Sequence, residues 1–428
     1  MQLIASPSGP LSGVAVIPPD KSISHRALIL GALAEGETRI EGLLEADDVL
    51  RTVDALRSFG VSVERLEPSR WRVIGGQWRS PDGPIDCGNS GTAARLLIGA
   101  AAGFPLSVTF TGDASLRRRP MDRLAPALAA MGARFEGGAT LPLTLQGGKL
   151  RGIRHRNLPP SAQVKSAILL AGLHAAGPVE IEEPLPTRDH TEILLRQFGA
   201  DLLNDEGVIR LGEGRQLVGT DVTIPADPSS GAFALAAAAI VPGSEVTVKE
   251  VLLNPLRSGF LMALQRMGAD LALDNVRGRC GETIGDVRVR HAPLFASDFA
   301  AEEMPSMIDE IPVLAVVAAF ASGETRIEGL SELRHKESDR LAGIVRGLDV
   351  CGVQARVEGD NLIIAGGPVR GGANIDSRCD HRITMAFAVL GLAAGKPVTV
   401  DGAEMIATSF PRFAEVMRAL GAEIDELE

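Results

Sequence analysis

The chain contains few cysteines, and their spacing is uninformative. Among 428 residues there are four cysteines, at positions 87, 280, 351 and 379, with no CxxC pair and no paired metal-binding spacing. A secreted disulfide framework and a cysteine-based metal site are therefore not expected. We predict reduced, buried thiols in a cytosolic protein that holds no metal.

Long apolar runs are also missing. The longest stretches, residues 233–241 and 311–320, are too short to span a bilayer, so they predict buried helices. The N-terminus has no basic segment followed by an apolar one, which argues against a secretory signal. We expect a cytoplasmic protein without a membrane partner.

Positive charge is not in excess, although it is concentrated locally. The formal net charge is −11, yet cationic clusters stand at residues 117–119, at residues 334–336 and at Arg340. An acidic chain is a poor partner for nucleic acid, whose backbone favours a basic face. A single surface arginine is usually solvated or paired with a carboxylate. For the clusters we favour the binding of a small anion.

The sequence repeats itself. GETRIEGL stands at residues 36–43 and again, identical, at residues 323–330. A helix-like segment follows each copy and ends in Gly before an alternating, strand-like stretch, and four further endings of this kind begin at residues 131, 198, 267 and 420. Six endings indicate six repeated strand and helix units.

A second helix-length segment with a polar start precedes each Gly-led strand. These six starts are Lys21-Ser-Ile-Ser-His-Arg, Gly88-Asn-Ser-Gly-Thr, Ser161-Ala-Gln, Asp227-Pro-Ser-Ser, Asp309-Glu-Ile-Pro and Asp380-His-Arg. Ser, Asp and Asn commonly serve only as helix caps. Six starts in register favour a further role, because helix N-termini directed at one cleft bind anions.

The ends of the chain suggest how the units are grouped. Only a short stretch follows Gly421, so we infer that the N-terminal segment completes the sixth unit. Six units are too many for one compact core, which favours two groups of three. We predict one domain at residues 20–226 and another at residues 1–19 plus 227–428. Hinge crossings then lie near 18–20 and 225–227.

Eight motifs together resemble 5-enolpyruvylshikimate-3-phosphate synthases, and they occur in that family's order over nearly the whole chain. They are PPDKSISHRALILGALA, DCGNSGTAARLLIGA, GDASLRRRPM, PPSAQVKSAILLAGL, PTRDHTEILL, PSMIDEIPVLAV, RHKESDRL and DHRITMAF. SAQVKSA and TRDHTE are similar to the bacterial branch often called class II.

The resemblance implies an α/β fold of two domains. Each would contain three repeated strand and helix units arranged as an inside-out α/β barrel, with the active site in the interdomain cleft. It also implies the transfer of the enolpyruvyl group of phosphoenolpyruvate to the 5-hydroxyl of shikimate 3-phosphate, with release of phosphate. No metal or organic cofactor is implied, and we expect a monomer.

The resemblance also assigns residues to the two anionic substrates. Shikimate 3-phosphate would be bound by Lys21, Ser22, Arg26, Ser161, Ala162, Gln163, Arg188, Asp309 and Lys336. Phosphoenolpyruvate would be bound by Lys21, Gly91, Arg119, Gln163, Arg340 and Arg382. Guanidinium groups match phosphate and carboxylate geometry, and Gly lets a backbone approach its ligand closely. Gly91 could instead be only a small residue at a helix start.

The reaction needs a proton acceptor for the hydroxyl and a donor for the methylene carbon. By resemblance Asp309 is the base, and Glu337 and Lys21 are the candidate donors. Cationic neighbours such as Arg334, Lys336 and Arg340 should lower the pKa of Glu337, which would make it a poor resting acid. Bound anions would reverse this effect, so the donor stays open.

The sequence departs from the family pattern at one place, and three other functions compete with this interpretation. Some family members have a Lys just before the Thr/Ser-Phe-Pro near the C-terminus, but residues 406–411 contain none, which leaves affinity for phosphoenolpyruvate analogues open. The enolpyruvyl transferases that act on UDP-N-acetylglucosamine usually have a Cys in the loop equivalent to residues 113–120, which has none here. RNA 3′-phosphate cyclases would need a basic face, which a net charge of −11 does not favour. A non-catalytic anion-binding scaffold would not need Asp309 with Lys336 and Glu337.

Overall fold

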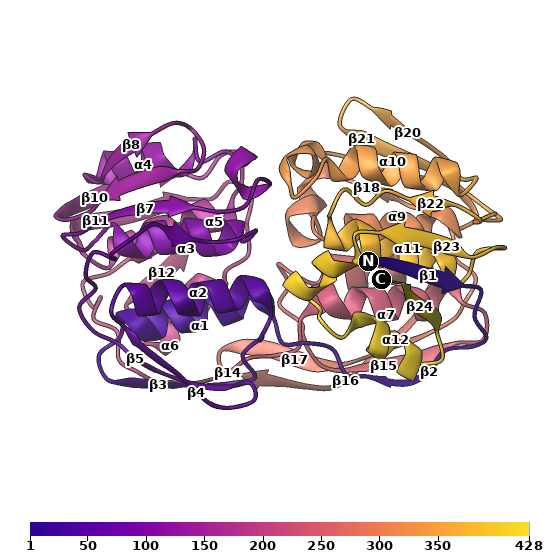
Figure 1. Cartoon of the computed structure of the whole chain (residues 1–428), viewed down its shortest axis with the longest axis horizontal. Coiled ribbons are helices and arrows are strands. Elements are labelled where there is room, and N and C mark those ends of the chain that lie inside the picture. Colours follow the sequence, from indigo (N-terminus) through magenta and orange to yellow (C-terminus); the bar gives the residue numbers. More distant parts are fainter. Residues whose placement is uncertain (428) are drawn as a thin grey trace. The chain divides into compact units, whose positions relative to one another are not determined.

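The computed structural model describes residues 1–427, which form two compact units (Figure 1). The Lys21 unit consists of Pro19–Ile224 and Arg279–Glu282. The Asp309 unit consists of Met1–Pro18, Pro225–Gly278 and the chain from Thr283 onward. Residues 279–282, which the sequence analysis placed with the second domain, instead cluster with the Lys21 unit. No change in composition marks this short excursion in the sequence.

Each unit contains three sheets of four strands, which is the predicted repeat pattern. The sheets of the Lys21 unit are, in spatial order, β14 (Asp221–Thr223), β3 (Glu37–Glu41), β5 (Arg70–Ile74) and β4 (Ser62–Glu67); β6 (Ile85–Asp86), β7 (Ser107–Thr111), β9 (Leu143–Gln146) and β8 (Arg134–Gly137); and β10 (Leu150–Arg156), β11 (Ala175–Glu182), β13 (Val208–Leu211) and β12 (Leu202–Asp205).

The Asp309 unit repeats the same strand order. Its sheets are β2 (Ser12–Ala15), β15 (Glu245–Leu252), β17 (Glu282–Arg290) and β16 (Asp270–Arg279); β18 (Asp298–Phe299), β19 (Gly323–Ile327), β21 (Asn361–Gly366) and β20 (Gln354–Glu358); and β22 (Asn374–Ile375), β23 (Val398–Asp401), β1 (Gln2–Ser6) and β24 (Glu423–Leu427). The first two strands of each sheet are parallel, and the second and third are antiparallel.

Two helices accompany each sheet. The inner helices are α1 (Lys21–Leu33), α3 (Gly91–Ala101), α5 (Ala162–Gly172), α7 (Pro228–Ile240), α9 (Ile311–Ala319) and α11 (His381–Gly391). The outer helices are α2 (Asp47–Ser58), α4 (Leu124–Met131), α6 (His190–Gln197), α8 (Gly259–Arg266), α10 (Arg340–Val350) and α12 (Phe413–Ala419). Short 3-10 helices are η1 (Leu116–Arg118), η2 (Ala301–Ser306), η3 (Ser331–His335) and η4 (Ala403–Thr408).

Each outer helix ends at a Gly in the left-handed region, as predicted. The six glycines, at positions 60, 132, 199, 268, 352 and 421, have φ between 85° and 116°. Gly reverses the chain there without a Cβ clash, so the following strand can return along the helix.

The two GETRIEGL copies occupy equivalent places. They form β3 and β19, the second strand of their sheets, and the Gly after each strand, Gly42 and Gly329, has φ near 75° and 73° respectively. The identity is therefore a trace of the repeated unit and confirms that part of the prediction.

The N-terminal segment completes the sixth unit, because β1 pairs antiparallel with both β23 and β24. The same segment also does something that was not predicted. Its second strand, β2, pairs parallel with β15 and so opens the fourth repeat, while β14 fills the equivalent place beside β3. In each unit the strand just before a crossing therefore completes a repeat that begins after the other crossing.

The inner helices form the core. Every residue of α7 and α9 is buried, and α7, α9 and α11 pack against one another. A helix that is buried on all faces needs small and apolar residues throughout, which explains why these segments are rich in Ala, Val and Leu. The predicted buried helices at 233–241 and 311–320 are thus confirmed. Within residues 1–427 no helix has the length and hydropathy to cross a membrane.

The prediction for the cysteines was partly wrong. All four are free, but only Cys87 and Cys351 are buried, whereas Cys280 is half-buried and Cys379 is exposed. Burial raises the pKa of the Cys351 thiol to about 11. Cys379 lies in a turn directly before Asp380, the residue that caps α11. Its place in this surface turn accounts for its exposure.

Candidate active site

In the Lys21 unit, the N-terminal ends of the three inner helices lie beside one another. His25 of α1 has its Nε2 3.4 Å from the Oγ of Ser90, which caps α3. Gln163, in the first turn of α5, donates from Nε2 to the Oγ1 of Thr92 at 2.9 Å. Three positive dipole ends therefore meet at one end of the helix bundle, an arrangement that favours an anion.

Gly91 begins α3 where two guanidinium groups come close. A Cβ on Gly91 would lie 2.7 Å from Nη1 of Arg95 and 3.3 Å from Nη1 of Arg119. Arg95 donates to Oε1 of Gln163 at 2.8 Å, and Arg119 donates to Oδ1 of Asn89 at 2.6 Å. The missing side chain of Gly91 therefore leaves room for both guanidinium groups.

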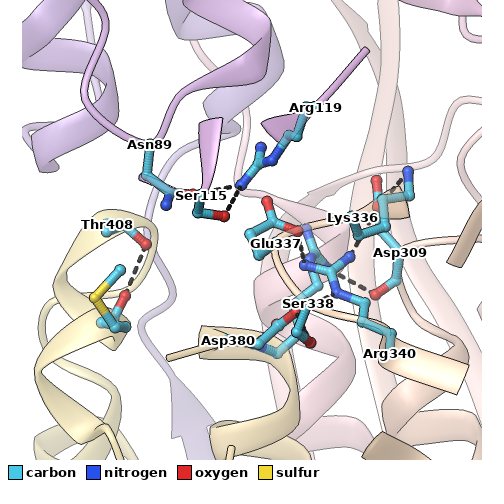
Figure 2. A network of polar contacts seen from close by, with 12 residues as sticks. Asn89, Ser115, Arg119, Asp309, Lys336, Glu337, Ser338, Arg340, Asp380 and Thr408 are labelled. Atoms are coloured by element: carbon cyan, nitrogen blue, oxygen red, sulfur yellow. Dashed lines mark hydrogen bonds and ion pairs between the residues drawn. The ribbon is translucent and has the colours of Figure 1, made fainter. Parts of the chain in front are cut away.

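The Arg117–Arg119 cluster divides between two environments. Arg117 and Arg118 are exposed, whereas Arg119 is only 8% exposed. The guanidinium of Arg119 also lies 3.4 Å from the Oγ of Ser115 (Figure 2). Of these three arginines, Arg119 is therefore the one whose side chain the protein encloses.

Lys21 is the first residue of α1, directly after the cap Asp20. Its Nζ forms an ion pair with Asp48 of α2, and 19% of its side chain stays exposed. Ser22 follows, and its carbonyl accepts a hydrogen bond from Nη1 of Arg26 at 2.9 Å. Arg26 is buried, with 4% of its surface exposed.

The other predicted residues of this unit lie at the start of α5 and before α6. Ser161 caps α5 by accepting from the amide of Val164 at 3.3 Å, and Ala162 is the first helical residue. Arg188 is half-buried in the irregular segment that precedes α6. The structure thus brings Ser22, Gly91, Ser161 and their neighbours to the N-terminal ends of one helix bundle.

The Asp309 unit shows the same convergence of helix starts. Ser229, in the first turn of α7, donates from Oγ to Oε1 of Glu310 at the start of α9. Arg382, in the first turn of α11, lies 3.6 Å from the same carboxylate and donates from Nη1 to the carbonyl of Asp309 at 2.9 Å. Buried Glu310 therefore joins all three helix starts.

Arg340 is the centre of an ion-pair network (Figure 2). Its guanidinium contacts Asp380 at 2.9 Å, Glu337 at 2.5 Å and Asp309 at 3.4 Å, and the side chain is 1% exposed. Burial opposes the positive charge, but Asp380, Glu337 and Asp309 outweigh it and raise the pKa of Arg340. The arginine stays charged and fixes three carboxylates around it.

Asp309 lies between two cations. Its Oδ1 is 3.4 Å from Nζ of Lys336 and 3.4 Å from Nη1 of Arg340. Burial disfavours the Lys336 ammonium, but Asp309 and Glu332 prevail and raise its pKa. The carboxylate of Asp309 therefore has a cation on each side. The network thus unites Asp309, Lys336, Glu337 and Arg340, as the sequence analysis grouped them.

One predicted helix start does not follow the capping pattern. Side-chain caps are present at α1, α3, α5, α7 and α11, but α9 has none, although Asp309 and Glu310 stand at its start. Both carboxylates are directed to cations or a hydroxyl instead. The cap interpretation is therefore wrong for Asp309.

The C-terminal departure is visible in the structure. Thr408 ends η4 and donates from Oγ1 to the carbonyl of Met405 at 2.7 Å (Figure 2). The hydroxyl proton of Thr408 is therefore donated within its own short helix.

Sequence reasoning missed four polar residues that hold the site together: Arg95, Lys165, Glu310 and Asp380. Arg95 stands four residues after Gly91, and Lys165 stands four residues after Ser161, so each lies one helical turn behind a predicted ligand. That spacing was the available signal. Glu310 and Asp380 were noticed only as parts of helix starts.

Comparison with known proteins decides the family. A sequence model of EPSP synthase (3-phosphoshikimate 1-carboxyvinyltransferase) matches residues 5–417. The chain belongs to the EPSP synthase family.

Relatives within the EPSP synthase family match over almost their full length. The 3-phosphoshikimate 1-carboxyvinyltransferase of Caulobacter vibrioides (strain NA1000 / CB15N) is 53% identical over an alignment of 437 residues, which covers 99% of each chain. That of Phenylobacterium zucineum (strain HLK1) is 54% identical over 431 residues, which cover 99% of this chain and 95% of the relative.

Solved structures agree with this membership. EPSP synthase from Acinetobacter baumannii superposes with a TM-score of 0.88 at 40% identity, covering 99% of this chain and 100% of that chain. The enolpyruvyl transferase NikO from Streptomyces tendae shares the fold, with a TM-score of 0.79 at 18% identity over 99% of this chain and 98% of its own. The predicted α/β class with repeated strand and helix units is confirmed.

Proposed function

We propose that this chain catalyses the reaction of its family. The enolpyruvyl group of phosphoenolpyruvate is transferred to the 5-hydroxyl of shikimate 3-phosphate, and phosphate is released. The carrying observation is Asp309, whose carboxylate is held between Lys336 and Arg340 at 3.4 Å from each. This reaction is a step of the shikimate pathway toward aromatic amino acids.

The Lys21 unit supplies most of the proposed substrate contacts. Shikimate 3-phosphate is bound by Lys21, Ser22, Arg26, Ser161, Ala162, Gln163 and Arg188, joined by Asp309 and Lys336 of the other unit. Phosphoenolpyruvate is bound by Lys21, Gly91, Arg119 and Gln163, joined by Arg340 and Arg382. Convergent helix N-termini support this assignment, because their free N–H groups and dipoles stabilise anions.

Asp309 acts as the base and removes the proton from the 5-hydroxyl. The oxygen then bonds to C2 of phosphoenolpyruvate, while a proton is added to the methylene carbon. Loss of a proton from the resulting methyl group and cleavage of the C2–O bond to phosphate restore the double bond. Glu337 and Lys21 are the candidate donors of the added proton, and no cofactor takes part.

We further propose that the two units are domains that close on the substrates at an interdomain cleft, with hinges at the crossings near residues 18–20 and 225–227. Ligands that contact both domains stabilise a closed state by their differential contacts. Small-angle scattering should give a smaller radius of gyration with saturating shikimate 3-phosphate. If calorimetry shows that the protein is saturated and the radius of gyration is still unchanged, the proposed domain closure is contradicted. The enzyme is proposed to act as a cytoplasmic monomer.

The activity is tested by product identification. The chain is incubated with phosphoenolpyruvate and either shikimate 3-phosphate or UDP-N-acetylglucosamine, and ³¹P NMR follows free phosphate and the product. We expect free phosphate and a new phosphoester resonance when shikimate 3-phosphate is the acceptor, and neither when UDP-N-acetylglucosamine is the acceptor. Turnover with the sugar nucleotide alone would contradict the proposal.

A further inference from the structure

A buried ionic cluster lies one helical turn behind the proposed shikimate 3-phosphate ligands of α5. Lys165 is 0% exposed, and its Nζ lies 2.7 Å from Oε2 of Glu183 and 2.7 Å from Oε1 of Glu192. Glu183 directly follows β11, and Glu192 stands in the first turn of α6. One lysine therefore links three separate elements of the Lys21 unit.

The cluster also holds the segment that joins β11 to α6. Residues 183–189 have no regular secondary structure, and Arg188 stands near their end. The Nζ of Lys165 donates to the carbonyl of Thr187 at 3.1 Å, and the Oγ1 of Thr187 donates to Oε1 of Glu183 at 2.5 Å. Asn157 donates to that same carboxylate oxygen at 2.9 Å. The residue directly before Arg188 is thus fixed through both its backbone and its side chain.

A second tie runs parallel to the first. The Oγ1 of Thr191 donates to the Oγ of Ser166 at 2.7 Å, and Arg26 of α1 donates to both hydroxyls, at 2.7 and 2.9 Å. Lys165 and Ser166 are neighbours on α5, as Thr191 and Glu192 are on α6. The start of α6 is therefore tied to α5 at two successive positions.

Stability alone does not account for this cluster. Removing charges from water is costly, and buried ion pairs can often be replaced by apolar residues without loss of stability. Here one ammonium faces two carboxylates, and burial raises the pKa of Glu192 although Lys165 lowers it. What the cluster achieves is geometry, because charged hydrogen bonds at 2.7 to 3.1 Å set the position of an otherwise irregular segment.

We propose that Lys165, acting with Glu183 on Thr187, is a positioning residue that fixes Arg188 for shikimate 3-phosphate. The inference rests on the proposed role of Arg188 and extends it to a side chain that itself does not reach the substrate. A segment held in its bound conformation costs less to order on binding. Loss of Lys165 should therefore weaken substrate binding through Arg188 and leave phosphoenolpyruvate binding largely unchanged.

A double-mutant cycle tests this. Calorimetry measures the dissociation constant of shikimate 3-phosphate for the wild type, Lys165→Met, Arg188→Gln and the double variant, and the binding stoichiometry reports the folded fraction. We expect Lys165→Met to weaken binding about tenfold in the wild-type background and less than about twofold when Arg188 is already Gln, since residues acting through one another are not additive. Lys149→Met, at an exposed lysine of the same unit, is the matched control and should change nothing.

Equal factors in both backgrounds, or an unchanged constant in both, would overturn the inference. If Lys165→Met does not fold, Thr187→Val replaces it in the same cycle, with about a threefold loss expected, because one of the two bonds that fix Thr187 remains. An unchanged constant for this variant would overturn the inference as well. If Arg188→Gln alone binds like the wild type, the proposed ligand assignment has failed, which is a separate outcome.

Discussion

Two of the proposed phosphoenolpyruvate ligands, Arg119 of the Lys21 unit and Arg340 of the Asp309 unit, have different contacts within their own unit. In the Lys21 unit, Arg119 and Arg95 donate to amide, hydroxyl and carbonyl oxygens. In the Asp309 unit, Arg340 is surrounded by the carboxylates of Asp309, Glu337 and Asp380. Amide and hydroxyl oxygens orient a guanidinium, whereas the carboxylates around Arg340 are groups that can also exchange protons. We propose that the Lys21 unit contributes mainly to anion binding and the Asp309 unit mainly to proton transfer.

The largest effect is expected at Asp309. Asp309→Asn keeps the shape of the side chain but removes its basic oxygen, so turnover should fall about a hundredfold or more, the usual scale for general acid–base catalysis. Phosphate release under saturating substrates measures this. Asp339→Asn is the matched control, because Asn can also cap α10. Near-normal turnover of Asp309→Asn would remove the base from this unit.

Asp380 should matter most for stability. Its Oδ2 contacts Nε of Arg340 at 2.9 Å, and the two side chains are 0% and 1% exposed. Asp380→Asn leaves a buried arginine without this charge, and breaking such pairs typically lowers the free energy of unfolding by about 3–5 kcal/mol. Urea unfolding measures the change. Glu415→Gln, which removes an exposed ion pair with Arg412, should have no measurable effect. An equally small change in the free energy of unfolding for both variants would contradict a stabilising role of the buried Arg340–Asp380 ion pair.

Gly91→Ala tests the phosphoenolpyruvate contacts that we propose for the Lys21 unit. The new methyl group would meet Arg95 and Arg119, whose guanidinium ends must move, and overpacking of this kind typically costs about 1–3 kcal/mol. We expect the inhibition constant of glyphosate, which is longer than phosphoenolpyruvate, to rise by a larger factor than the KM for phosphoenolpyruvate. Steady-state kinetics on both proteins measure the two factors. Equal factors would place Gly91 away from the part of the pocket that distinguishes the two compounds.

The smallest effect is a pH dependence at His25. Burial, with Lys21 and Arg26 nearby, lowers the pKa of His25 well below its ordinary value of 6.5, so the folded chain keeps this imidazole neutral. The unfolded chain takes up the proton as the pH falls below about 6.5, so stability is lost below that pH, by at most about 1.4 kcal/mol per pH unit. Urea unfolding at pH 8 and pH 5 should show a smaller loss for His25→Gln than for the wild type. His335→Gln, at an exposed site, should match the wild type.

Local signals in the sequence predicted the repeated architecture well. The GETRIEGL copies, the Gly residues after outer helices and the polar helix starts each report on a few neighbouring residues, and the structure keeps all of them in register. Periodicity and capping are local effects, so one sequence suffices to detect them.

Features that depend on distant partners were missed. The role of β2 in opening the fourth repeat depends on pairing with β15, more than two hundred residues away. The role of Lys165 depends on Glu183, Thr187 and Glu192, which lie 18 to 27 residues further along the chain. The excursion of residues 279–282 into the Lys21 unit likewise leaves no local mark. Spacing of four residues from a predicted ligand was the only sequence signal for Arg95 and Lys165.

The proposed roles of the two units, anion binding and proton transfer, are tested most directly by one titration. Calorimetry measures the dissociation constant of shikimate 3-phosphate for Asp309→Asn and for Arg188→Gln, each against the wild type. We predict that Asp309→Asn stays within about threefold of the wild type, while Arg188→Gln weakens binding about tenfold or more, because charge-assisted bonds to the ligand are lost. Strong binding by Arg188→Gln together with a large loss in Asp309→Asn would contradict the account.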